Sequence, residues 1–138
     1  MNFSKSKFYS GELLSYYSPD YSDDSSLGVP LIDFVPSIDI QPLRNTTGEI
    51  WDFVLSDLSR ANGLLTTQSS VTFISRDFIT ALRARIAAYR GNYETALPLA
   101  MGLLNKYGIA DRTEYSDMWF DQDNTEIIFK LERSQGDP

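Results

Sequence analysis

Hydrophobic residues recur at helical spacing in two neighbouring stretches of this 138-residue chain, on either side of a Gly-Asn pair. In the first stretch the apolar residues lie three or four positions apart, which is the spacing of one face of an α-helix. They are Ile79, Leu82, Ile86 and Tyr89. The same spacing resumes after Gly91 and Asn92 and continues to Tyr107. Because Gly and Asn suit a tight turn, the pattern predicts a helical hairpin over residues 76–107.

Small side chains form a second stripe beside the apolar one, and Ala84 and Ala88 belong to it. Together with Gly91, Tyr93 and Ala96 they resemble the inter-helix turn of a tetratricopeptide repeat. In that repeat Gly frees the turn, Tyr packs across it and Ala permits close contact between helices. A helical hairpin without repeat ancestry explains the same residues, so both interpretations stay open.

An earlier apolar stripe predicts a helix that begins near residue 46 and ends near residue 65. Asn45, Thr46 or Thr47 would be its N-cap, and Glu49 would lie near the positive end of the helix dipole. The stripe consists of Ile50, Phe53, Val54, Leu58, Ala61, Leu64 and Leu65, widened by Trp51 and Leu55.

One carboxylate, Asp57, lies among the apolar residues of this predicted helix. A charged group among apolar neighbours needs a partner, so we expect a structural salt bridge from Asp57 to Arg44 or Arg76. An acid-base role for this carboxylate is the alternative.

The segment before this helix contains three prolines, Pro30, Pro36 and Pro42, among apolar residues. Proline excludes a regular helix there, so we expect an extended backbone that wraps around the helices. Residues 1–44 would therefore be an extended or loop segment, and residues 45–108 the helical core.

The residues after the hairpin predict a loop and then a short strand. Gly108 is a plausible left-handed C-cap, and residues 111–123 have loop chemistry, with Phe120 expected in the core. The run Glu126–Leu131 is β-branched and aromatic, which is typical of a strand. Within the second hairpin helix, Pro98 predicts either a kink or a regular helix that starts near Thr95.

These elements predict a mainly α fold: an α-α helical hairpin scaffold like that of tetratricopeptide repeats, with an extended N-terminal segment and a short C-terminal β-strand. Residues 1–138 would form a single helical domain or a fragment of one, in which residues 109–138 supply the loop and strand. At 42% hydrophobic residues, the chain can bury a core.

Composition excludes several functions. The chain has 12 Lys and Arg against 19 Asp and Glu, a formal charge of -7, which argues against nucleic acid as a partner. It has no Cys and no His, so thiol nucleophiles, histidine bases and the common zinc sites are excluded. The acidic turn at residues 121–126 has Glu126 where a calcium loop needs Gly, so we interpret it as a solvated turn. We expect no metal, no cofactor and no enzymatic activity.

The order of several motifs resembles the N-terminal helical region of the SusD/RagB family. The motifs are Gly28-Val29-Pro30-Leu31, Arg44 before a capped helix, Asp57-Leu58 with Ala61 and Leu65, Arg76 leading Ala81, Leu82 and Ala84-Arg85 into Gly91-Asn92-Tyr93 and Ala96, and Glu126-Ile127-Ile128-Phe129. The likeness spans about residues 27–131. Members of this family are surface-exposed outer-membrane lipoproteins of Bacteroidetes with a tetratricopeptide-like scaffold. They bind glycans or other nutrients and pass them to a TonB-dependent transporter.

The resemblance implies a nutrient-binding protein at the cell outer membrane, held there only by a lipid anchor that this chain lacks. A full member is several times longer, so the chain corresponds to a scaffold region. Aromatic side chains that could stack on a sugar ring are Tyr16, Tyr17, Tyr21 and Trp119. The alternative is an intracellular tetratricopeptide-like adaptor that binds a partner peptide between its helices.

Overall fold

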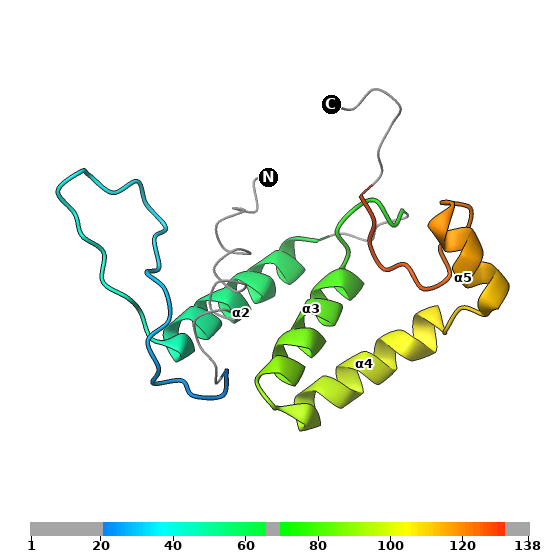
Figure 1. Ribbon diagram of the computed structural model, residues 1–138, viewed down its shortest axis with the longest axis horizontal. Helices are drawn as coiled ribbons and strands as arrows, with labels where there is room; N and C mark the ends of the chain where they lie inside the picture. Colours follow the sequence, from blue (N-terminus) through cyan, green and yellow to red (C-terminus); the bar gives the residue numbers. More distant parts are fainter. Residues whose placement is uncertain (1–20, 66–69, 132–138) are drawn as a thin grey trace. The chain divides into compact units, whose positions relative to one another are not determined.

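The computed structural model describes residues 21–65 and 70–131 of the chain. These residues contain four helices, α2 (Thr47–Leu64), α3 (Arg76–Tyr89), α4 (Tyr93–Tyr107) and α5 (Arg112–Trp119) (Figure 1). No strand occurs in this part of the chain; Leu27 and Thr46 form an isolated β-bridge. The predicted mainly α class is confirmed.

The chain divides into two compact units. The first consists of residues 1–60 with the short segment Tyr89–Gly91, and the second consists of residues 61–88 and 92–138. Most of α2 therefore belongs to the first unit, whereas nearly all of α3 and the whole of α4 and α5 belong to the second.

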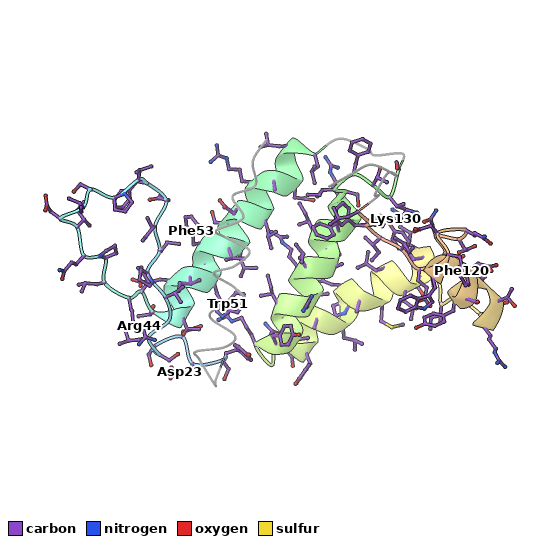
Figure 2. All side chains as sticks on the ribbon, turned by 45° about the horizontal axis from the view of Figure 1, so that its top comes forward. Asp23, Arg44, Trp51, Phe53, Phe120 and Lys130 are labelled. Carbon is purple, nitrogen blue, oxygen red and sulfur yellow. The ribbon has the colours of Figure 1, made fainter. Side chains whose placement is uncertain are left out.

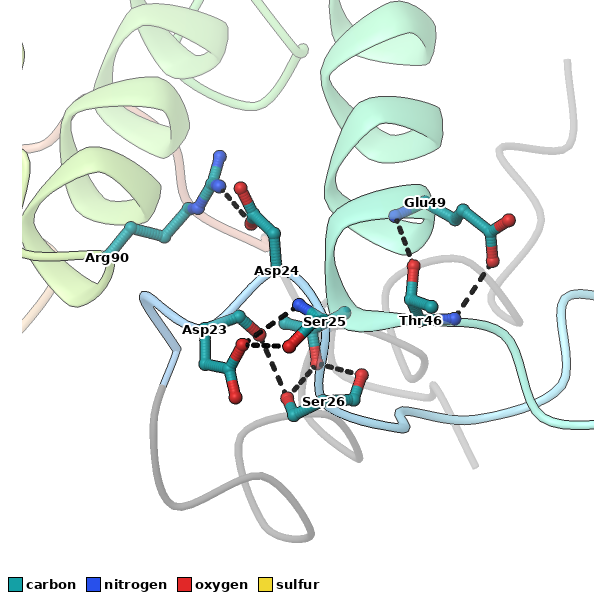
Figure 3. Close-up of polar contacts among 8 residues, drawn as sticks. Asp23, Asp24, Ser25, Ser26, Thr46, Glu49 and Arg90 are labelled. Atoms are coloured by element: carbon teal, nitrogen blue, oxygen red, sulfur yellow. Dashed lines mark hydrogen bonds and ion pairs between the residues drawn. The ribbon is translucent and has the colours of Figure 1, made fainter.

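In the first unit, α2 begins with every free backbone donor of its first turn satisfied. The N–H groups of Thr47 and Gly48 donate to the carbonyl oxygens of Ser26 and Asp24 at 2.8 and 3.0 Å. The N–H of Glu49 donates to Oγ1 of Thr46 at 3.2 Å, and the Glu49 carboxylate accepts the N–H of Thr46 at 2.9 Å (Figure 3). This reciprocal pair is a capping box, so the N-cap is Thr46. It also lowers the pKa of Glu49.

The loop that supplies these carbonyl groups has its own contacts. The Asp23 carboxylate accepts the N–H and the hydroxyl of Ser25 at 2.9 and 2.6 Å. The Ser26 hydroxyl lies 2.7 Å from that of Thr47, which is fully buried. The Asp24 carboxylate pairs with Arg90 at 2.5 Å (Figure 3). We call this arrangement the α2 clamp: residues 23–26, the first turn of α2, and Arg90.

Among the described residues, the proline-containing segment is attached only at its base, which corrects the expectation that it wraps around the helices. Asn45 accepts the N–H of Gly28 at 2.8 Å, and its side chain accepts that of Leu31 at 2.8 Å. Arg44 donates to the carbonyl groups of Leu27 and Gly28 (Figure 2). Every residue from 32 to 43 is exposed. The apolar side chains of this loop find no helix face to cover within their unit.

The predicted hairpin is present: α3 up to Ala88 and the whole of α4 belong to the second unit, and the turn lies at Gly91 and Asn92, where the sequence predicts it. Gly91 has a φ of 72°, and the Asn92 side chain accepts the N–H of Thr95 at 3.1 Å as the N-cap of α4. Ala84 and Ala96 are each only 8% exposed. Tyr93, however, is 70% exposed, so it is not buried across the turn. The detailed likeness to a tetratricopeptide repeat stays a prediction.

A polar contact joins the two open ends of the hairpin. The Asp77 carboxylate, at the start of α3, accepts the hydroxyl of Tyr107 at 2.7 Å and also binds the ammonium of Lys106. Because Lys106 and Tyr107 end α4, the two helices run antiparallel. The contact lowers the pKa of Asp77, mainly through the Lys106 hydrogen bond. Burial and the Asp77 hydrogen bond raise the pKa of Tyr107 to about 12.

Helix α4 begins at Tyr93 and contains Pro98, so the expectation of a regular start near Thr95 is wrong. Proline has no N–H, so the backbone bond to the carbonyl of Glu94 is absent. Gly108 has the expected positive φ, 73°, and its N–H donates to the carbonyl of Leu104 at 2.8 Å. Its ψ of −163° differs from the left-handed helical value.

Two expectations for the C-terminal part are wrong. Residues 112–119 form a helix instead of a loop, and residues 126–131 form no strand. A strand needs a neighbouring edge to pair with, whereas this run makes one backbone–backbone hydrogen bond to a distant segment of the described chain, from the N–H of Lys130 to the carbonyl of Val71 at 2.9 Å. Its aromatic residue packs as expected of an apolar run, since the rings of Phe129 and Phe78 lie 5.0 Å apart.

The proposed arginine partners of Asp57 make other contacts. Arg44 donates to the loop carbonyl groups described above, and Arg76 donates to the carbonyl of Leu65 at 3.0 Å. Asp57 is half-buried on α2. Its pairing with either arginine stays a prediction. Trp51, in contrast, is buried as expected, at 5% exposure.

The α2 clamp makes a prediction about glycine. A Cβ at Gly48 would lie 2.9 Å from the Cβ of Asp24 and 3.1 Å from its carbonyl oxygen. We expect Gly48→Ala to lower the free energy of unfolding by about 1–3 kcal/mol, because the loop must move away from the helix. Gly63→Ala, in the same helix with nothing within 4 Å, is the matched control and should be neutral or stabilising by up to about 1 kcal/mol. Urea unfolding measures both, and equal values for the two variants would contradict the clamp.

The hairpin contact makes a prediction about pH. The pKa of Asp77 is lower in the folded than in the unfolded chain, so its stabilisation is present above the ordinary value of 3.8 and disappears as the pH falls through the folded value. Between pH 7 and pH 3, the parent should lose about 0.5–1 kcal/mol more unfolding free energy than Asp77→Asn, a modest amount because Lys106 is mostly exposed. Parallel pH dependences for parent and variant would show that the contact contributes nothing.

Candidate functional site

Helix α5 is short, and side chains cap its N-terminus. The Asp111 carboxylate accepts the N–H groups of Thr113 and Glu114 at 2.7 and 2.8 Å. The Glu114 carboxylate in turn accepts the N–H of Asp111 at 2.8 Å, which completes a capping box. No residue of α5 is buried, so this local bonding replaces the apolar packing that holds most helices.

A hydrogen-bonded turn caps the C-terminus of α5. The N–H of Gln122 donates to the carbonyl of Asp117 at 2.9 Å, and the N–H of Asp121 donates to that of Met118 at 3.2 Å. These are the two bonds of a Schellman motif, and Asp121 occupies its left-handed position with a φ of 57°. The chain therefore folds back over the last turn of α5.

Three aromatic side chains lie on this closed end, and we call Tyr115, Trp119 and Phe120 the aromatic platform. Tyr115 and Trp119 are four residues apart on one helix face. Their rings lie 6.2 Å apart at 78°, an edge-to-face contact. Trp119 is 72% exposed and Phe120 71% exposed. The expectation of Phe120 in the core is wrong, because it follows the last residue of a helix that has no buried face (Figure 2).

Other segments of the second unit bind the residues that flank α5. The Glu126 carboxylate accepts the N–H of Ala110 at 2.5 Å, just before α5. Asp121 pairs with Lys130 at 3.5 Å. Because the Lys130 backbone is itself bonded to Val71, the platform is connected to the segment that precedes α3.

The site is rich in carboxylates. Asp123 accepts the N–H of Thr125 at 2.6 Å, and hydrogen bonds from Thr125 lower the pKa of that carboxyl. Among the described residues, no group of three or more acidic side chains is arranged to hold a metal ion. Trp119 and Phe120 expose most of their surface, and the same segment supplies hydrogen-bond acceptors, a combination of groups that can bind a sugar ring by stacking.

The other proposed ligand residues lie elsewhere. Tyr16 and Tyr17 fall outside the described residues. Tyr21 belongs to the first unit, is half-buried, and contacts the ring of Tyr89 at 6.0 Å and 62°. Trp119 belongs to the second unit. Sequence reasoning missed Tyr115, although its spacing from Trp119 and the Asp111-x-x-Glu114 pattern could have revealed it.

Comparison with solved structures shows what the fold is similar to. A SusD superfamily protein from Bacteroides thetaiotaomicron matches 81% of the chain with a TM-score of 0.69 and 24% identity. A candidate sugar-binding protein from Bacteroides vulgatus matches 89% with a TM-score of 0.71 and 26% identity. The chain has a SusD-like fold. It spans 26% and 30% of the lengths of these two solved chains.

The SusD-like chain gives no match to protein-family models or to curated protein sequences. Its likeness to the family is therefore carried by the fold and by the order of motifs from which the resemblance was predicted. Among the described residues, no helix has the length and apolar character needed to cross a membrane.

Proposed function

We propose that this SusD-like chain is part of a non-enzymatic protein that binds glycans at the bacterial outer-membrane surface and delivers them to a TonB-dependent transporter. The observation that carries the proposal is the fold likeness over 81–89% of the chain, which includes a candidate sugar-binding protein. Attachment to the membrane would use a lipidated Cys, a residue that these 138 positions do not contain.

Within such a protein, the described helices would form the scaffold, because the chain spans less than a third of the solved chains. Among the described residues, the aromatic platform is the surface that best fits a sugar. The apolar C–H face of a pyranose matches a flat aromatic face, and each such contact contributes about 0.5–1.5 kcal/mol. The capping box and the Schellman turn fix the helix that carries the rings, so little further ordering is needed on binding.

Three of the described carboxyl groups lack the raised pKa that a glycosidase acid requires. Glycoside hydrolysis needs two carboxyl groups on either side of the sugar, one of them with a raised pKa. The pKa values of Glu49, Asp77 and Asp123 are all lowered by hydrogen bonds. A lowered pKa favours the ionised form of these three groups, which is the opposite of what a glycosidase acid needs.

A glycan array, followed by calorimetry on the glycans that bind, tests the proposal. The 138-residue chain should be compared with the complete product of its gene. Binding by either protein, without release of shorter sugars, is the expected result. If neither binds any glycan, the proposal fails and peptide ligands of a tetratricopeptide-like adaptor should be sought. Release of shorter sugars would contradict the non-enzymatic role.

The aromatic platform makes a sharper prediction. We expect Trp119→Ala to weaken glycan binding roughly three- to tenfold, because it removes one stacking face. Tyr93→Ala is the matched control: Tyr93 is 70% exposed in the same unit but lies outside the platform, so binding should not change. Calorimetry gives the dissociation constants. A loss with Tyr21→Ala and none with Trp119→Ala would move the site to the first unit.

A further inference from the structure

The charge around the aromatic platform is unevenly distributed. Residues 109–130, which are all described, carry six carboxylates and two cations. The carboxylates are Asp111, Glu114, Asp117, Asp121, Asp123 and Glu126. Three of these, Asp117, Asp121 and Asp123, lie within four residues of Trp119 in the sequence, and the Schellman turn keeps Asp121 next to the end of the helix.

The two cations offset part of this charge, and six carboxylates against two cations leave an excess of four. Lys130 is already paired with Asp121 at 3.5 Å. Arg112 is in the first turn of α5, seven residues from Trp119, which corresponds to about 10 Å along a helix.

We propose that the aromatic platform selects neutral glycans and rejects glycans that carry uronate or sulfate groups. The inference rests on the proposed function, because it specifies the ligand class of the same site. A neutral sugar gains the stacking contact and can donate its hydroxyl groups to the surrounding carboxylates. An anionic sugar at the same place meets a segment, residues 109–130, in which carboxylates outnumber cations six to two, so its charge is repelled.

The first test measures the charge at the platform without any glycan. The chain has two tryptophans, Trp51 at 5% and Trp119 at 72% exposure, so soluble quenchers reach Trp119 selectively. The ratio of caesium quenching to iodide quenching should be higher for the protein than for free N-acetyltryptophanamide. Trp119→Phe should abolish most of the quenching, which would confirm that the quenched fluorescence comes from Trp119. A ratio that favours iodide would overturn the proposal.

The second test measures selectivity with pairs of oligosaccharides that share one backbone. Suitable pairs are xylo-oligosaccharides with and without glucuronic acid branches, and galactan oligosaccharides with and without sulfate. In 20 mM salt, the neutral member should bind roughly tenfold more tightly, and the difference should shrink in 500 mM salt as the charges are screened. Equal affinity, or tighter binding of the anionic member, would overturn the proposal.

A charge variant with a matched control distinguishes the effect of charge near the platform from the effect of the total charge of the chain. Asp117→Asn with Asp121→Asn should raise affinity for the anionic member several-fold, and Asn tolerates the left-handed position of residue 121. Asp33→Asn with Asp39→Asn changes the total charge equally in the other unit and should have no effect. Equal effects of the two double variants would overturn local selection.

The outcomes also distinguish this inference from the proposed function. If neutral and anionic members bind equally, glycan binding stands and only the charge selectivity fails. If no glycan binds in either salt concentration, the proposed function fails and the selectivity fails with it, whatever the quenching ratio shows.

Discussion

The first unit depends on how the free N–H groups at the start of α2 are satisfied. A helix leaves its first N–H groups without partners inside the helix, and buried donors without partners are costly. Here the carbonyl groups of Asp24 and Ser26 accept two of them, and Thr46 accepts a third. Gly48 allows the loop to come this close, since a Cβ there would overlap Asp24. Because Asp24 also pairs with Arg90, one short loop joins the helix start to the segment between α3 and α4 within the same unit.

Features that depend on a few neighbouring residues could be predicted from the sequence. The cap at Thr46, the positive φ of Gly91 and the extents of α2 and α3 follow from local hydrogen bonding, backbone sterics and apolar spacing. Burial of Trp51 and Ala84 follows from the apolar and small-residue stripes. The likeness to SusD proteins was recognised from the order of such local features along the chain.

Features that depend on distant partners were not predicted. The run Glu126–Leu131 has strand-like residues, but strand formation needs an edge that the sequence pattern cannot supply. The proline segment was expected on a helix surface because its side chains are apolar, yet Val35 and Ile38 are 95% and 99% exposed. Helix α5 was missed for the opposite reason. It has no apolar stripe facing a core, and its capping box and Schellman turn determine where it begins and ends.

The same absence of a core-facing stripe explains why the candidate site is on α5. A helix held by packing must turn its aromatic residues inward, whereas a helix held at both ends by hydrogen bonds can leave Tyr115 and Trp119 in solvent. The acidic residues that fix the ends, Asp111, Glu114 and Asp121, also belong to the six carboxylates that outnumber the two cations of residues 109–130. Support of the helix and selection of the ligand by charge would thus arise from the same carboxylates. For this reason Asp117, which neither caps the helix nor occupies the left-handed position, is the position at which charge can be changed with least effect on the fold.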